Sequence, residues 1–320
     1  MICKKKQPFV LDIVQNKLLF TPFSAIRFAM HRIYANRINS CGMSRVFCDL
    51  RSQKNTSQNI TSEQLSKQFY MRKEKKATAL LKILCYSKGY EGKTMNYKNT
   101  IRGIFKDRPN RFIAHVQIGD QLETVHVKNT GRCRELLVPE AEVILEKSDN
   151  PARKTKYDLI SVNKEGRWIN MDSQAPNKAA EEWVAAGNLF PEKVTVRREK
   201  TYGNSRFDLY VESGKRKAFI EVKGVTLEEN NIVRFPDAPT ERGIKHLCEL
   251  MHAATDGYEA YLLLVIQMKG VRYFEPNWET HPEFGETLKA AADAGVHILA
   301  YDCAVTEDSM KICDPIPVRL

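Results

Sequence analysis

The chain has 320 residues, 42% of them hydrophobic and 28% charged, which suffices for one large domain or two ordinary ones. No apolar run approaches the length of a transmembrane helix, and the eight cysteines form no C-x-x-C pair, which favours reduced thiols in a cytoplasmic protein over a disulfide scaffold. The net charge of +11 suggests a nucleic-acid partner, but residues 1–94 carry 18 Lys and Arg against 5 Asp and Glu, and the remainder carries 32 against 34. A nucleic-acid surface beyond residue 94 must therefore be a local patch.

Residues 1–94 show no strand–turn rhythm and no clear apolar period. Three interpretations compete: a basic targeting peptide, a genuine basic arm, or a natural start of synthesis at Met95. The third is favoured, because Glu91-Gly92 would be encoded by a purine run where a bacterial ribosome-binding site belongs, and an ordered pattern opens at Met95. We expect 1–94 to be a disordered basic extension or no part of the natural protein.

From residue 101 onward, short apolar runs alternate with turn residues such as Gly119-Asp120 and Asn150-Pro151. The pattern predicts strands over 101–106, 112–118, 122–127, 142–146, 159–163 and 168–171. This many short strands in so short a segment is typical of a small barrel, and the oligonucleotide/oligosaccharide-binding (OB) fold is the natural candidate. Residues 95–172 are therefore predicted to form an OB-like domain.

After Asp172 helices and strands alternate, which predicts an α/β (α+β) domain over 173–320. Helices are expected over 177–186, from an N-cap at Thr240 behind Pro239, and over 283–294. Strands are expected over 193–198, 206–212, 217–224, 260–267 and 296–301.

Two carboxylates fall on neighbouring strands of this domain. If Gly214-Lys215 forms a two-residue type II′ hairpin, Ser213 pairs with Arg216, and Asp208 lies opposite Glu221. Opposed carboxylates have Cβ atoms about 5 Å apart and repel each other unless a proton or cation intervenes. A divalent ion with oxygen ligands suits such a pair, and Lys223, on the same face as Glu221, is placed to orient or deprotonate a metal-bound water.

Two alternatives stand beside this hypothesis. A loop at Ser213-Gly214 would instead place Asp208 opposite Phe219. Glu and Lys two residues apart on a strand are also common by chance, and often form a solvated edge. The pairing with Asp208, the hairpin and the apolar flanks favour a functional site.

The Asp208…Glu221-Val222-Lys223 pattern resembles the signature of the PD-(D/E)XK nuclease superfamily. Longer motifs are similar to those of the sugar fermentation stimulation protein family, SfsA, and the similarity extends essentially from Met95 to Leu320. These motifs are Asn129-Thr130-Gly131, Ser148-Asp149-Asn150, Ser205-Arg206-Phe207-Asp208, Glu221-Val222-Lys223-Gly224-Val225-Thr226-Leu227, 235–243 and 296–301.

The resemblance implies an N-terminal OB-like domain, a nuclease-like C-terminal domain, and nucleic-acid binding with metal-dependent nuclease activity. It implies that Asp208 and Glu221 bind Mg²⁺ or Mn²⁺ and that Lys223 is the catalytic lysine. A preceding helix carries an acidic catalytic residue in that fold, and Glu182 matches the position better than Glu181, which implies that Glu182 binds a metal ion or a metal-bound water.

Several basic residues are candidates for nucleic-acid contacts. Arg132 and Arg134 follow the Asn129-Thr130-Gly131 turn in a stretch expected to be helical. This segment is either a phosphate-binding site or an ordinary loop of the OB fold. Arg153 and Lys154 lie after the Asn150-Pro151 turn and either track a nucleic-acid backbone or form a solvated turn. The remaining candidates are Arg206, Arg242 and Lys245; for His246 the sequence favours no role beyond a surface position.

Two functions are argued on this basis, and a third, a structural or protein-interaction role, has only the family name's link to sugar metabolism to support it. The first is a divalent-metal-dependent nuclease acting on DNA or RNA, with no role at a membrane. The second is a non-catalytic DNA-binding regulator of sugar-metabolism genes that uses a nuclease-like fold. An intact Asp–Glu–Lys set favours the enzyme, because opposed carboxylates would repel an anionic ligand unless a cation intervened.

Overall fold

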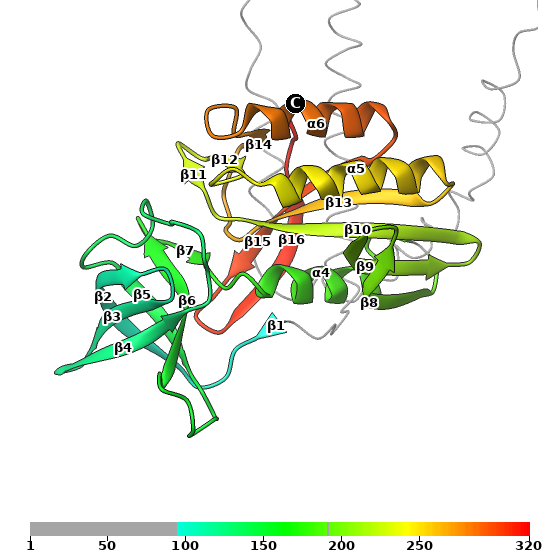
Figure 1. Ribbon diagram of the computed structural model, residues 1–320. Coiled ribbons are helices and arrows are strands. Elements are labelled where there is room, and N and C mark those ends of the chain that lie inside the picture. The colour runs from blue at the N-terminus through cyan, green and yellow to red at the C-terminus, as the bar shows by residue number, and fades with distance from the viewer. Residues whose placement is uncertain (1–94, 191) are drawn as a thin grey trace, which may run out of the picture. The chain divides into compact units, whose positions relative to one another are not determined.

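The structure is a computed structural model that describes residues 95–190 and 192–320 (Figure 1). The expectations for residues 1–94 lie outside the described part of the chain. Among the described residues, no helix is both long enough and apolar enough to cross a membrane.

The first sheet closes into a barrel. Its strands lie in the order β4-β3-β2-β5-β6-β7, and β4 also pairs with β6, so that β2 to β6 form a ring. Alternate side chains such as Val116, Val125 and Val143 are fully buried, as the two-residue period of strands requires. The strands are β2 (Thr100–Asn110), β3 (Ile113–Ile118), β4 (Gln121–Val127), β5 (Glu142–Lys147), β6 (Tyr157–Lys164) and β7 (Arg167–Asn170). The expected OB-like barrel is confirmed.

The second sheet has seven strands in the order β1-β16-β15-β13-β10-β9-β8. β10, β13 and β15 run parallel at its centre, and the outer strands pair antiparallel. Both faces of β13 are covered, which explains its continuous apolar run. The strands are β1 (Met95–Asn96), β8 (Val194–Tyr202), β9 (Ser205–Ser213), β10 (Arg216–Val225), β13 (Glu259–Ile266), β15 (His297–Val305) and β16 (Ser309–Pro315).

Helices cover both faces of this sheet (Figure 1). α4 (Ala175–Ala185) packs on one face through Trp183 and Val184, and α5 (Glu241–Thr255) and α6 (Pro282–Asp293) lie on the other. A small third sheet comprises β11 (Glu228–Glu229), β12 (Ile232–Phe235) and β14 (Tyr273–Pro276). The expected mixed α/β class is confirmed, whereas β1, β16 and the small sheet were not predicted.

Candidate active site

The hairpin between β9 and β10 has the predicted turn. Gly214 has a φ of 58° and Lys215 is not among the positive-φ residues, as a type II′ turn requires. Ser213 pairs with Arg216, and the same register continues to the pair of Leu209 and Ile220. The predicted register is therefore confirmed as far as the pair of Leu209 and Ile220, which are the chain neighbours of Asp208 and Glu221.

Asp208 lies where this ladder ends. Its Oδ2 accepts a hydrogen bond of 2.8 Å from the backbone N–H of Val222, and its Oδ1 accepts one of 2.7 Å from Nδ2 of Asn177 on α4. The carboxylate thus takes the place of a backbone acceptor on the neighbouring strand. β10 on one side and α4 on the other fix the orientation of Asp208.

Glu221 is 2% exposed and faces α5. Its Oε1 accepts a hydrogen bond of 2.5 Å from Nζ of Lys223 and also contacts Nδ1 of His246. Its Oε2 is buried and has no hydrogen-bond partner among the described residues. A buried carboxylate oxygen without a partner is costly, so this atom is a candidate ligand for a group that the polypeptide does not supply.

His246 is buried, which corrects the surface position favoured by the sequence. Its Nε2 accepts a hydrogen bond of 3.4 Å from Nε of Arg242. The ring proton therefore lies on Nδ1, which donates a hydrogen bond to Oε1 of Glu221. The missed signal is the helical period: Gly243, Leu247 and Leu250 are buried on α5, and His246 lies on the same face.

Burial and charge move the pKa values of the two carboxylates in opposite directions. Burial, followed by the charge of Glu221, raises the pKa of Asp208. Burial also acts to raise the pKa of Glu221, but the hydrogen bond from His246 and the charge of Lys223 outweigh it, and this pKa is lowered. The site therefore holds one firmly ionised carboxylate beside a second whose ionisation is opposed.

A cation would relieve that opposition. Asp208 and Glu221 offer the hard oxygen ligands that Mg²⁺ and Mn²⁺ prefer, and the unpartnered Oε2 of Glu221 fits such a group. Glu182 lies on α4, five residues beyond Asn177, with its side chain partly exposed. The α4 side chain that bonds Asp208 is Asn177, a contact the sequence did not reveal.

The predicted nucleic-acid residues fall into two groups. Arg132 and Arg134 are exposed beside a single turn rather than on the expected helix, and Lys154 is also exposed. Arg153 is instead bound to Asp158 by two hydrogen bonds of 2.9 and 2.6 Å, so it stabilises the barrel.

The other predicted contacts surround the start of α5. Arg206 is exposed and lies 3.4 Å from Glu199, and Nζ of Lys245 donates to the carbonyl of Asn204. Arg242 is exposed and anchors His246, so among these three it has the most direct connection to Glu221.

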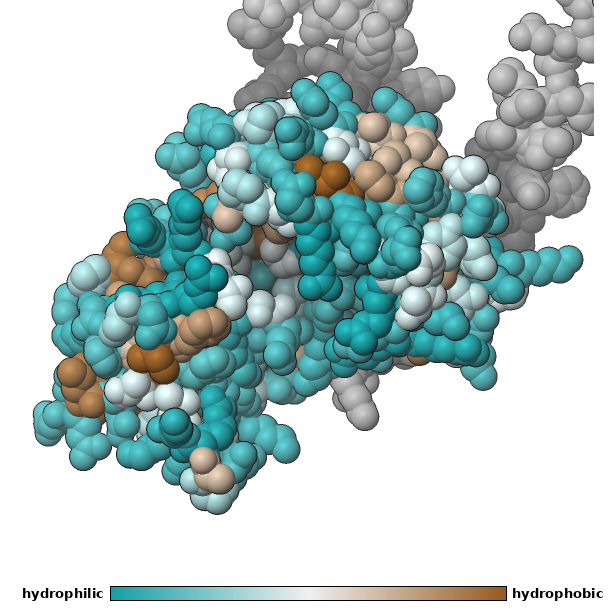
Figure 2. Space-filling view, viewed as in Figure 1, coloured by the Kyte–Doolittle hydropathy of each residue, from teal (hydrophilic) through white to brown (hydrophobic). Residues whose placement is uncertain are grey.

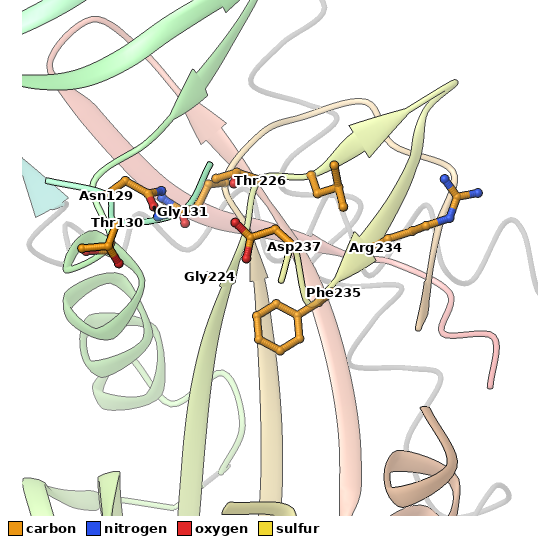
Figure 3. A pocket seen from close by; sticks show the side chains of 11 residues that line it. Asn129, Thr130, Gly131, Gly224, Thr226, Arg234, Phe235 and Asp237 are labelled. Carbon is orange, nitrogen blue, oxygen red and sulfur yellow. Dashed lines mark hydrogen bonds between the residues drawn. The ribbon is translucent and has the colours of Figure 1, made fainter. Parts of the chain in front are cut away.

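A cavity of about 190 Å³ lies where the barrel meets the second sheet, and Figure 3 shows its lining. Asn129, Thr130 and Gly131 border it from the loop after β4, and Asp237 faces them from the segment after β12. Gly224, directly after Lys223, also lines it, which joins this cavity to the strand that carries the candidate catalytic residues.

Comparisons with known proteins agree with this architecture. The family model described as SfsA N-terminal OB domain matches residues 107–171, and the one described as Sugar fermentation stimulation protein RE domain matches residues 174–309. The chain belongs to the SfsA family.

Individual SfsA relatives match over most of their length. A sugar fermentation stimulation protein homolog from Ruminiclostridium cellulolyticum is 60% identical over 226 residues, which are 71% of this chain and 100% of the relative. A homolog from Clostridium beijerinckii is 58% identical over the same shares. The solved structure of Pyrococcus furiosus SfsA in complex with Ca²⁺ is 29% identical, with a TM-score of 0.65, and the match covers 71% of this chain and 99% of that one.

Proposed function

We propose that this SfsA protein is a divalent-metal-dependent nuclease that hydrolyses phosphodiester bonds in DNA or RNA. The observation that carries the proposal is the unpartnered, buried Oε2 of Glu221, placed beside Lys223 and close enough to Asp208 for its charge to raise that pKa. Further support comes from the positions of Asp208 and Glu221, which both come directly after the last pair of the β9–β10 ladder, counted from the turn.

Asp208 and Glu221 would hold Mg²⁺ or Mn²⁺, with Glu182 as a third candidate ligand. When bound, such an ion polarises the scissile phosphate and lowers the pKa of a coordinated water. The Pyrococcus furiosus SfsA structure is a complex with Ca²⁺, which supports a divalent-cation site in the family. Ca²⁺ and Mg²⁺ both favour oxygen ligands.

The chain's own residues would organise the reacting groups. The Lys223 ammonium, with its side chain 16% exposed, has further N–H donors for a phosphate oxygen beyond the one given to Glu221. His246 holds Oε1 of Glu221, which leaves Oε2 for the cation, and Arg242 fixes the His246 ring. Asn177 and the backbone N–H of Val222 orient Asp208 by donating to Oδ1 and Oδ2, and each of these oxygens has a further lone pair for a cation.

A nucleic-acid-binding regulator without turnover is the second candidate. One observation favours it: Lys223 already forms an ion pair with Oε1 of Glu221, which His246 also contacts, so Lys223 balances part of the charge of this carboxylate. Such a protein would bind nucleic acid through its basic side chains and would not need a cation.

The deciding experiment is cleavage of labelled single- and double-stranded DNA and RNA by the full chain with Mg²⁺, Mn²⁺ or EDTA. Glu221→Gln and Lys223→Met should each lower the metal-dependent rate by about 100-fold or more, as loss of a charge-stabilising group does in other enzymes. Glu229→Gln, at an exposed glutamate, is the matched control. Binding without cleavage under every metal would favour the regulator.

A further inference from the structure

The barrel carries a second, more open cavity of about 490 Å³, which we call the arginine pocket. Arg111 of the β2–β3 turn and Arg132 and Arg134 of the loop after β4 line it, together with Arg108. Three separate arginines converge here from segments about twenty residues apart in the sequence, so the pocket is a product of the fold.

The partners of the arginines set this pocket apart. Between residues 95 and 320, every arginine outside the pocket makes an ion pair, a hydrogen bond or a ring contact through its side chain. Arg111, Arg132 and Arg134 have no ion pair, side-chain hydrogen bond or ring contact with any described residue. Three guanidinium groups held near one another without an anion repel each other, and an anionic ligand would relieve that repulsion.

The fourth arginine builds the pocket and is not available to a ligand. The guanidinium of Arg108 donates to the backbone carbonyls of Asn129, Gly131 and Arg132 in one segment and of Arg111 in the other, at 2.7 to 3.0 Å. It therefore ties the two segments together. The three unpartnered arginines thus stand on a fixed frame, which lowers the entropy lost on binding a ligand.

An exposed aromatic side chain adjoins the pocket. Phe112 follows Arg111 directly and is 51% exposed, and its backbone N–H donates to Oδ1 of Asn110, another residue of the pocket lining. Figure 2 shows the visible face as mainly hydrophilic with small separate apolar patches, and among the described residues only Phe112 and Trp278 are exposed aromatic side chains. Exposed aromatic rings beside arginines are the means by which OB folds stack the bases of single strands.

The pocket also adjoins the cavity of Figure 3, because Thr130 and Gly131 line both. Gly224 on the far side of that cavity precedes Val225 and follows Lys223 on β10. A continuous series of lining residues therefore leads from the arginine pocket to the strand that holds Glu221.

We propose that the arginine pocket binds a backbone phosphate of a single-stranded polynucleotide, with Phe112 stacking on a neighbouring base. Duplex nucleic acid would be a poorer ligand, because its bases are already stacked on one another. Binding of the strand is independent of the proposed nuclease function. Only the claim that the bound strand is the substrate of the carboxylate site rests on that function.

The test is fluorescence anisotropy with labelled oligo-dT, oligo-rU and a duplex, each of about twelve nucleotides, within the site size of an OB fold. The full chain is used in EDTA, so that binding is measured without cleavage. Arg111→Gln, Arg132→Gln and Arg134→Gln should each reduce the slope of log affinity against log salt by about 0.7. This change corresponds to an affinity about fivefold weaker at 0.1 M salt. Phe112→Ala should weaken single-strand binding about tenfold with the slope unchanged.

Arg197→Gln is the matched control, because Arg197 is exposed and paired with Glu212 on the far edge of the second sheet. Duplex binding as tight as single-strand binding, or an unchanged salt slope in the combined arginine variant, would overturn the inference. The oligo-dT and oligo-rU arms separate DNA from RNA. Single-strand binding that is lost in the arginine variants but kept in Glu221→Gln supports the pocket even if no cleavage occurs. Failure of the nuclease proposal can therefore be distinguished from failure of the pocket proposal.

Discussion

At the scale of single residues, the same chemical group serves different purposes in different surroundings. Arg153, a predicted nucleic-acid contact, donates two hydrogen bonds to Asp158, which His126 also approaches at 2.9 Å. Burial acts to raise the pKa of Asp158, and the hydrogen bonds from Arg153 and His126 with the charge of Lys128 outweigh it, so this pKa is lowered. Sequence shows that an arginine is present but not whether an acid already neutralises it.

This arrangement makes part of the stability depend on pH. Because the pKa of Asp158 is lower in the folded state, its contribution is complete above the unfolded pKa of about 3.9 and is lost as the pH falls through the folded value. Asp158→Asn should cost about 2 kcal/mol at pH 7, and the gap to the wild type should close below about pH 4. Urea unfolding across pH measures this. Asp120→Asn, in an exposed turn, is the control; a gap that does not change with pH would refute the assignment.

At the scale of elements, local patterns were sufficient wherever a segment finds its partner nearby. The β9–β10 register followed from one glycine turn, and the start of α5 from Thr240 behind a proline. β11 consists of two glutamates, which have poor strand propensity, and β14 has only four residues and ends in a proline, so the fold rather than a local pattern pairs them with β12.

The same limit applies to the candidate site. Asp208, Glu221 and Lys223 lie on one hairpin and were predicted together. Asn177 and His246 reach the same carboxylates from helices 31 and 25 residues away, and neither contact has a local signature. Tertiary packing thus brings the supporting residues to the site, and they are harder to predict from the sequence than the carboxylates that they orient.

The cap of α5 offers a test at this scale. The Thr240 hydroxyl accepts a hydrogen bond of 3.0 Å from the backbone N–H of Gly243. Thr240→Ala should lower the free energy of unfolding by about 1 kcal/mol, and Thr240→Ser should restore most of it. Thermal unfolding followed by circular dichroism would show the difference. Thr287→Ala on α6, away from the cap position, should have a smaller effect; equal losses would argue against capping.

At the scale of the whole described chain, a buried polar cluster joins the barrel to the second sheet. Nε2 of Gln267, after β13, donates to Oδ1 and the carbonyl of Asn170 and to the carbonyl of Asp172, at 3.0 to 3.1 Å. Asn170 in turn donates to the hydroxyl of Tyr97, which bonds Asp172. These contacts fix the OB-like barrel to the strand next to β10.

Loss of this cluster should separate the unfolding of the two parts. Gln267→Ala removes three buried hydrogen bonds and should cost about 2 kcal/mol or more. It should also separate the transitions reported by Trp168 in the barrel and Trp183 on α4, each observed in a variant that retains only that tryptophan. Gln117→Ala, at a more exposed glutamine of the barrel, is the control. A single shared transition in Gln267→Ala would show that other contacts dominate the junction.

The closure of the barrel has a consequence for access to the candidate active site. β4 and β6 meet through the pairs His126–Asp158 and Val127–Leu159, immediately before the loop at Asn129 that borders both cavities. Local opening of this seam would displace that loop while the rest of the ring stays paired. If the two proposals hold, the free energy of this local opening would set how often a bound strand reaches Asp208 and Glu221.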